Sequence, residues 1–288
     1  MNLLAICLLI LMSFATQAKD VNDRRDAQPE GLVKIAVLRG EVEIEGWDRA
    51  EIEVKGELDE LATDLRFEVK DGVTEIEVIM PRHNVNWADG SDLVIRVPFQ
   101  SKVAVDAVST DIVVEDVRGS LQLRTISGEI KMKGGRERMN LKTVSGDITT
   151  EDTVGRLQAS STSGDIDISN HEGDFDGESM SGEIDVVAKD VSRMRGSSVS
   201  GKVSVKVGFT TEARAELTSV SGKIVVRVMK PIDLSLQVDS NSGDIDNDLS
   251  DDKAFEMFGM KSLRSQIGKG SGTLTVRSVS GAIELEEG

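Results

Sequence analysis

The sequence predicts an all-β solenoid in which stacked coils share one core. A short unit, Ser-Gly followed by a charged residue and then Ile or Val, recurs along the chain, and successive glycines are mostly 18 to 21 residues apart. On both sides of each glycine, apolar residues alternate with polar ones, which is the strand period of two. Ser and Gly between the two arms favour a corner and disfavour a helix. One coil cannot bury its own apolar face, so repeated coils are expected to stack.

Equivalent positions of successive units form columns, and four of these columns are largely apolar. We expect all four to point into the core. Two residues after the glycine stand Ile112, Ile130, Ile148, Ile166, Ile184, Val203, Ile224, Ile245 and Ile283. Two residues before it stand Val108, Ile126, Val144, Thr162, Met180, Val199, Val220, Asn241 and Val279. The other two columns lie seven and five residues before the glycine and begin at Val103 and Val105.

The Ser-Gly corners are expected to be structural. Glycine supplies a backbone conformation that is closed to most residues and takes up little space. The serines are expected to stack coil on coil, with their hydroxyls donating to backbone or neighbouring hydroxyl groups. A nucleophilic serine needs a base, and none recurs beside them. These serines are Ser127, Ser145, Ser163, Ser181, Ser200, Ser221, Ser242 and Ser280.

The first eighteen residues resemble a secretory signal peptide, expected to be helical and cleaved after Ala18. Cys7, the only cysteine, lies in this segment and resembles a lipoprotein box only faintly, because Ile6 stands where a small residue is expected. We therefore expect an exported protein, periplasmic or at the cell surface, whose mature chain has no transmembrane span. Residues 19–31 are polar and charged and predict a disordered spacer.

The solenoid is predicted over residues 32–288. Residues 32–100 are its irregular N-terminal part. Within it, Asp71-Gly72 suits a hairpin turn, so residues 56–100 form either further coils or a hairpin. Residues 101–246 are regular coils, and residues 270–288 are the last coil. Between them, residues 247–269 predict a partly helical excursion that caps the open end, using Phe255, Phe258 and Leu263.

The chain is strongly acidic, with 51 Asp and Glu against 34 Lys and Arg and a net charge of -17. Such a charge disfavours binding to nucleic acid. Cations, cationic peptides and uncharged sugars are the partners that it favours, so the expected ligand is an envelope or surface protein or glycan.

The residue after each glycine forms a column of charge that begins with acids and continues with Lys202 and Lys223. Carboxylates about 4.8 Å apart repel unless water or a cation relieves them. A solvated corner is the favoured interpretation, and a Ca²⁺-binding edge is the alternative. The acids of this column are Asp111, Glu129, Asp147, Asp165 and Glu183.

A second acidic cluster covers residues 244–252 but lacks the glycine and terminal Glu of an EF-hand loop. No cofactor other than Ca²⁺ is suggested. Across both groups, the candidate metal ligands are Asp147, Asp165, Asp244, Asp246 and Asp248.

Three stretches resemble a bacterial envelope family of putative adhesins, a domain-of-unknown-function family of β-strand repeats. They are Gly40–Trp47 (GEVEIEGW), Leu93–Pro98 (LVIRVP) and the iterated Val-Ser-Gly-Asp-Ile unit, and the resemblance extends from Val33 to Glu286. It implies a right-handed parallel β-helix-like fold and export, and it brings no catalytic residues.

The function favoured is a non-catalytic, adhesin-like or envelope scaffold protein. The alternative is a polysaccharide lyase or hydrolase, because carboxylates on adjacent coils lie near the spacing that a retaining glycosidase needs. Against this alternative, His83 and His171 are the only histidines and nothing in the sequence marks either as a base. The chain also has no Tyr and only two Trp to form sugar platforms.

Overall fold

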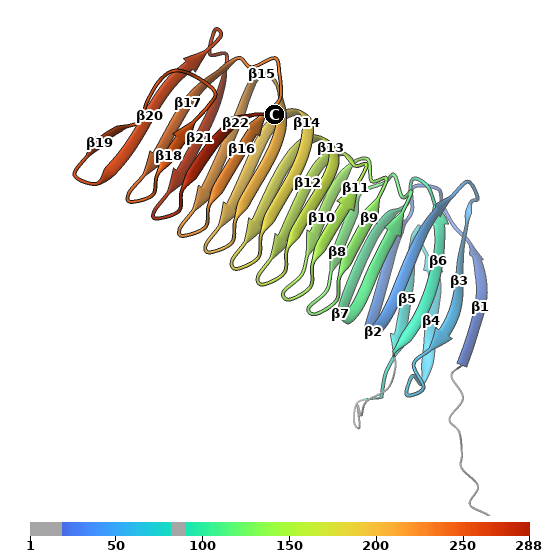
Figure 1. Ribbon diagram of the computed structural model, residues 1–288. Helices are drawn as coiled ribbons and strands as arrows, with labels where there is room; N and C mark the ends of the chain where they lie inside the picture. The colour runs from blue at the N-terminus through green and yellow to red at the C-terminus, as the bar shows by residue number, and fades with distance from the viewer. Residues whose placement is uncertain (1–18, 82–89) are drawn as a thin grey trace, which may run out of the picture.

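The computed structural model describes residues 19–81 and 90–288, and within them every regular element is a strand. The strands lie side by side along one long axis, so the molecule is an elongated stack (Figure 1). The all-β prediction is therefore confirmed. The predicted signal peptide, residues 1–18 with its helix, lies outside the described residues. Nowhere in the described ranges is there a helix long and apolar enough to cross a membrane.

The regular coils pair in parallel, with equivalent residues opposite each other. Ile148, for example, is opposite Ile130 on one side and Ile166 on the other. All three are at most 1% exposed, so this column is continuous through the core. The strands here are β7 (Lys102–Glu115), β8 (Leu121–Arg124), β9 (Ile130–Lys133), β10 (Arg138–Lys142), β11 (Ile148–Glu151), β12 (Val154–Ser161), β13 (Ile166–Ser179), β14 (Ile184–Ser198), β15 (Val203–Ser219) and β16 (Ile224–Val228).

Several coils turn at their second corner on a residue in the left-handed backbone region. Its φ is 55° at Asp116, 55° at Asp152 and 52° at Asn170. Gly134 occupies the same column with φ 78°. Asp, Asn and Gly adopt this conformation more readily than other residues, so the sequence marks this corner as well as the Ser-Gly corner.

The C-terminal coils do not stack in chain order. The last coil lies between two earlier ones, because β21 pairs in parallel with both β15 and β17, and β22 pairs with both β16 and β18. The strands here are β17 (Leu234–Ser240), β18 (Ile245–Asn247), β19 (Phe255–Met257), β20 (Met260–Ile267), β21 (Gly272–Ser278) and β22 (Ile283–Glu287).

The excursion predicted over residues 247–269 does lie at the end of the stack, but it is not helical. It contains the hairpin β19–β20, and β20 pairs antiparallel with β17 (Figure 1). Leu263 is 1% exposed, as expected of a capping residue. The expectation for Phe255 and Phe258 is wrong, because they are 66% and 93% exposed. The hairpin covers the end by strand pairing, which places its turn away from the core.

At the opposite end, antiparallel strands also close the stack. The sequence left residues 56–100 open between coils and a hairpin, and both kinds of pairing occur. Asp71-Gly72 turns the antiparallel hairpin β4–β5, while β5 and β6 each pair in parallel with β2. The strands are β1 (Lys19–Asp26), β2 (Leu32–Trp47), β3 (Glu51–Leu58), β4 (Asp64–Lys70), β5 (Val73–Ile79) and β6 (Ser91–Pro98).

The predicted disordered spacer over residues 19–31 is wrong for most of its length. Lys19–Asp26 forms β1, which pairs antiparallel with β3 over its whole length. Val21 packs against the core, and Arg24 forms ion pairs with Glu51 and Glu53. Its polar composition suggested disorder, but Lys19 and Arg24 form ion pairs with residues of other strands.

Candidate functional site

The inward position at each Ser-Gly corner is a hydroxyl residue three places before the glycine. Thr125 shows the pattern: its Oγ1 accepts the backbone N–H of Gly128 (3.2 Å) and donates to the carbonyl of Thr110 in the preceding coil (3.1 Å). This buried column was not predicted from the sequence, although every member is Thr or Ser at one offset. The members are Thr125, Thr143, Ser161, Ser179, Ser198, Ser219, Ser240 and Ser278.

The corner glycines are needed for space. A Cβ placed on Gly164 would lie 1.9 Å from the carbonyl oxygen of Gly146 in the preceding coil. None of the eight glycines from Gly128 to Gly281 at these Ser-Gly corners has a positive φ. The expectation of little space is confirmed, and that of an unusual backbone conformation is wrong at these corners.

The column two residues before the glycine points outward, which corrects the prediction that it is buried. The strand phase explains this, because positions seven, five and three before the glycine face inward and the next position must face out. We call the large exposed members of this column the apolar stripe, and they are 38–55% exposed. They are Val108, Ile126, Val144, Met180, Val199, Val220 and Val279.

The serine next to each corner glycine is also exposed. As predicted, some of these hydroxyls donate to backbone, for example Ser200 to the carbonyl of Met180 (3.2 Å) and Ser221 to that of Val199 (3.3 Å). The eight serines form a row beside the apolar stripe, which we call the serine row.

The acidic column is held partly by the backbone. The Oδ1 atoms of Asp111, Asp147 and Asp165 each accept the backbone N–H of the equivalent residue in the next coil, at 2.7–2.8 Å. Glu129 forms an ion pair with Lys131 at 2.8 Å. These contacts give the short Asp side chain a structural role at this position. Calcium binding by Asp147 and Asp165 stays a prediction.

The second acidic cluster is not gathered around one point. Asp244 forms an ion pair with Lys261 of β20, which lowers the pKa of the Asp244 carboxyl. Asp246 and Asp248 lie on the exposed surface nearby. Across residues 19–81 and 90–288, no three His, Cys, Asp or Glu side chains are grouped so that they could hold a metal ion.

His171 is part of the core. It is fully buried, its Nδ1 lies 2.9 Å from the hydroxyl of Thr153 and its Nε2 lies 3.2 Å from the carbonyl oxygen of Asp174. Burial lowers the pKa of His171 and keeps its ring neutral. The other histidine, His83, lies outside the described residues.

A cleft of about 610 Å³ crosses the outer face of β12, β13, β14, β15 and β21. Its outward positions carry long Arg side chains beside shorter Asp and Thr side chains. Asp174 is opposite Arg156, and Thr273 is opposite Arg214, in the parallel ladder. We call it the arginine groove. Its arginines are Arg156, Arg193, Arg195, Arg214 and Arg277.

The arginine groove contains both guanidinium groups and a carboxylate oxygen that have no partner among the described residues. Arg193, Arg195 and Arg277 lie 2.9–4.0 Å from the carboxylates of Asp174, Asp176 and Glu216. Within the described part of the chain, Arg156 and Arg214 have no such partner. The Oδ1 atom of Asp176 is buried without a hydrogen bond. A buried acceptor of this kind favours a ligand that brings a donor.

The match to known families covers nearly the whole stack. Residues 33–286 match the model described as Toastrack DUF4097. The chain belongs to the Toastrack DUF4097 family. This agrees with the resemblance that the repeated corners suggested. None of the curated proteins matches the chain.

Several solved structures are similar to this toastrack chain over most of its length. A putative adhesin from Bacteroides fragilis NCTC 9343 is 10% identical, with a TM-score of 0.43, and the alignment covers 93% of this chain and 97% of that one. A putative adhesin from Parabacteroides distasonis ATCC 8503 is 16% identical, with a TM-score of 0.34 and coverage of 94% and 98%. A putative cell adhesion protein from Clostridium sporogenes ATCC 15579 is 13% identical, with a TM-score of 0.24 and coverage of 94% and 100%.

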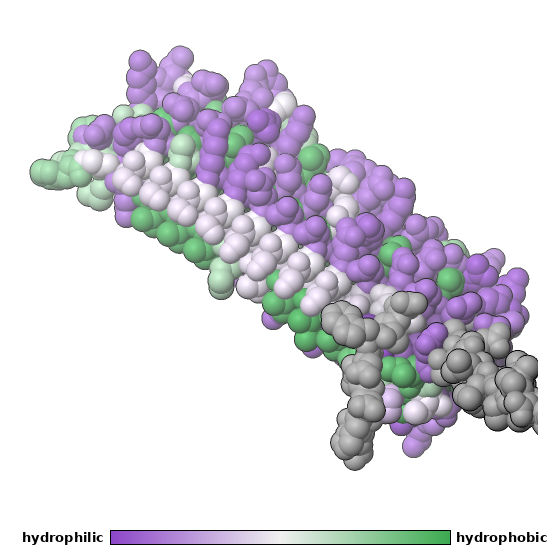
Figure 2. All heavy atoms as spheres, turned by 60° about the horizontal axis from the view of Figure 1, so that its bottom comes forward, coloured by the Kyte–Doolittle hydropathy of each residue, from purple (hydrophilic) through white to green (hydrophobic). Residues whose placement is uncertain are grey.

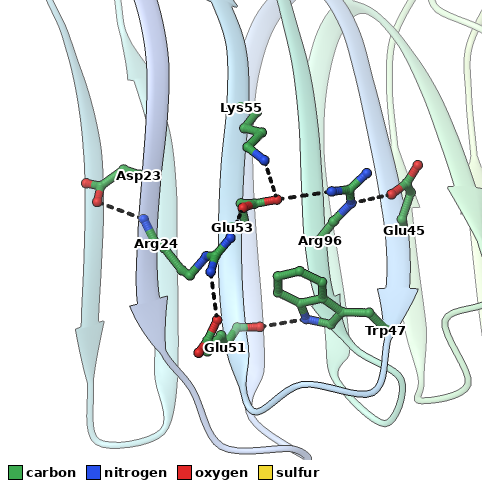
Figure 3. Close-up of polar contacts among 8 residues, drawn as sticks. All are labelled: Asp23, Arg24, Glu45, Trp47, Glu51, Glu53, Lys55 and Arg96. Atoms are coloured by element: carbon green, nitrogen blue, oxygen red, sulfur yellow. Dashed lines mark hydrogen bonds and ion pairs between the residues drawn. The ribbon is translucent and has the colours of Figure 1, made fainter.

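One cluster of charged residues connects β1 with the part of the chain that matches the Toastrack family. β1 itself precedes the matched residues. Glu53 of β3 is 2% exposed, and three cations surround its carboxylate (Figure 3). Arg24 of β1 contacts Oε1, while Lys55 and Arg96 lie 3.0 Å and 3.2 Å from Oε2. Trp47 donates its ring N–H to the carbonyl of Glu51 (2.8 Å).

The charges of this cluster compensate each other. The hydrogen bond from Arg24, followed by that from Lys55, lowers the pKa of Glu53 to about 2. Arg96 also forms an ion pair with Glu45 at 2.6 Å. The cluster therefore holds β1 against the rest of the stack. Its charged groups form ion pairs with each other, which indicates a structural role.

Proposed function

We propose that this protein is a non-catalytic, adhesin-like interaction module of the cell envelope, exported to the periplasm or the cell surface. We further propose that the stack is a right-handed parallel β-helix-like solenoid, because parallel crossover connections are almost always right-handed. The arginine groove supports the interaction role best. Five arginines gather there in a chain of net charge -17.

The ligand proposed for the arginine groove is a carboxylate-bearing glycan. Guanidinium groups bind carboxylates through paired, charge-assisted hydrogen bonds, and Arg156 and Arg214 are available for this. Sugar hydroxyls can donate to the unpaired oxygen of Asp176. Thr273 and Thr275 add hydroxyl groups at the wall. An acidic polysaccharide has both the carboxylates and the hydroxyls that this lining requires.

The test is retention of the full chain on immobilised polygalacturonate, with neutral dextran as the reference. We expect binding to polygalacturonate that weakens with NaCl, and no comparable binding to dextran. Replacing both unpaired arginines (Arg156→Gln with Arg214→Gln) should weaken retention at least tenfold. The matched control, Lys206→Gln with Lys253→Gln, removes the same charge from exposed sites outside the groove and should change retention little.

The same sample tests the enzymatic alternative. Incubation should leave the length of the polygalacturonate chains unchanged, as measured by reducing ends and by absorbance of unsaturated products. Equal loss of binding in the two double variants would show that retention depends on net charge and not on the arginine groove. Shortening of the polysaccharide would favour the lyase or hydrolase interpretation.

A further inference from the structure

The edge of the stack that carries the Ser-Gly corners has an unusual composition for a surface. Figure 2 shows a row of apolar residues beside a paler row along one edge of the molecule. The apolar stripe and the serine row are such neighbouring rows. Large exposed apolar patches usually mark interaction sites. The stripe is not needed for the core, because buried Thr and Ser fill the inward corner position.

The charged column lies on the other side of the corner glycines, and its charge changes from one end of the edge to the other. It is acidic at Glu129, Asp147, Asp165 and Glu183 and then becomes basic at Lys202 and Lys223. Along the stack, these positions are followed by Ala282 and then by Asp244, which is paired with Lys261. Along this edge, four acidic corners are therefore followed by two basic corners and then by a nearly neutral end.

Two copies can place such edges face to face with two-fold symmetry in two ways. If the axis runs along the stack, the apolar stripe of one copy faces the charged column of the other. If the axis runs across the stack, the two stacks are antiparallel and each column faces its own counterpart. Only the antiparallel arrangement buries apolar residues against apolar residues, because a two-fold interface uses one surface patch twice.

Charge complementarity selects the same arrangement. When all eight Ser-Gly corners overlap in antiparallel order, the corner at Gly182 faces that at Gly201, and the corner at Gly164 faces that at Gly222. Glu183 is then opposite Lys202 of the second copy, and Asp165 is opposite Lys223. Opposite charges across an interface fix its register and disfavour other partners.

We propose that the apolar stripe and the serine row are a self-association surface, on which a second copy of this chain packs antiparallel. Eight corners spaced by about 4.8 Å make an edge about 34 Å long. This edge is narrow, so the interface belongs to the small, transient class. The dimer is therefore reversible and depends on concentration.

Sedimentation velocity of the full chain over a range of concentrations tests the proposal. We expect a monomer–dimer equilibrium that weakens as NaCl is raised. Met180→Lys with Val199→Lys, at the centre of the stripe, should abolish the dimer without changing the melting temperature, since both side chains are about half exposed. Val187→Lys is the matched control, because Val187 is 37% exposed but lies outside the stripe.

Exchanging the charges at Glu183 and Lys202 tests whether the partner on the apolar stripe is a second copy of this chain. Glu183→Lys alone and Lys202→Glu alone should each weaken the dimer, because they place like charges opposite each other. The double exchange should restore it. A monomer at all concentrations, or a double exchange as weak as the single ones, would overturn the proposal. Flotation of a monomeric protein with phosphatidylcholine vesicles would instead assign the stripe to a lipid surface.

Discussion

At the residue scale, the Ser-Gly corner is held by a buried hydroxyl and by the absence of a side chain. The backbone ladder is interrupted at this bend, so the glycine N–H needs another acceptor. The Thr or Ser three residues earlier supplies it at 2.8–3.2 Å in every one of the eight corners. The exposed serine next to the glycine does not accept this hydrogen bond.

Removing the buried hydroxyl should therefore cost more than removing the exposed one. Thr125→Val keeps the shape of the side chain but leaves the N–H of Gly128 without an acceptor, at a cost of about 1–3 kcal/mol in the free energy of unfolding. Ser127→Ala should change it by less than about 0.5 kcal/mol, as at other exposed sites. Urea denaturation measures both. Equal midpoints would contradict the assignment of the corner hydroxyl.

The corner glycine should tolerate no side chain. Gly164→Ala places a Cβ against the carbonyl of Gly146, and separating the two coils by the required distance should cost about 1–3 kcal/mol. Gly259→Ala is an informative comparison. It has a positive φ of 81° with no atom nearby, so only the backbone conformation opposes it. We expect Gly164→Ala to lower the melting temperature more.

Glu53 should make the free energy of unfolding depend on pH in the acidic range. Its carboxyl has an ordinary pKa of 4.5 in the unfolded chain and about 2 in the fold. The unfolded state therefore binds the proton first, so the contribution is complete above pH 4.5 and is lost as the pH falls towards 2.

The test of this effect is the variant Glu53→Gln. It should lose about 1.5–3 kcal/mol at neutral pH, because hydrogen bonds to a charged group are removed. Its stability should also fall less steeply than that of the wild type between pH 4.5 and pH 2, as measured by urea denaturation at each pH. Parallel curves for the two proteins would contradict the role of Glu53.

At the element scale, both ends of the parallel stack are closed by antiparallel strands, but with different chemistry. β1 and β4 are rich in charged residues, which discourages further strand pairing. β19 at the other end is short, and Phe255 and Met257 are exposed. Its shortness limits what can pair with it.

The C-terminal cap should depend on Leu263 and not on the hairpin tip. Leu263→Ala creates a cavity beneath β20 and should cost about 2–5 kcal/mol. Phe258→Ser should leave the melting temperature almost unchanged, because Phe258 is 93% exposed. Thermal unfolding followed by circular dichroism compares the two. A large loss with Phe258→Ser would show that the tip packs against the protein.

At the scale of the whole molecule, the period and the strand phase decide how much could be predicted. Ile148, Ile166 and Ile184 follow from the period alone, and the structure aligns them in one buried column. Val144 and Val199 are exposed although they are apolar, because the strand phase decides which side chains face the core. The insertion of the last coil, β21–β22, could not be predicted, because a 38-residue step fits either stacking order.

The arginine groove was also beyond prediction, for a physical reason. Arg156, Arg193 and Arg214 are polar residues at outward positions, which the sequence shows only as surface. Their gathering depends on which coils are neighbours. Arg214 meets Thr273 only because the last coil lies next to β15. Its location therefore follows from the stacking order that the sequence did not determine.

A stack of coils should also fail locally, because each coil contacts only its neighbours. Ile166→Asp replaces a side chain whose burial stabilises by about 1.5–3 kcal/mol, and it adds a buried charge that costs more. We expect amide hydrogen exchange to accelerate first in β11, β13 and β14, which border this position. Protection in β1 and β3, at the far end, should persist. Asp167→Asn, one residue on and facing solvent, should change exchange little. Uniform loss of protection along the chain with Ile166→Asp would instead show that the stack unfolds as a single cooperative unit.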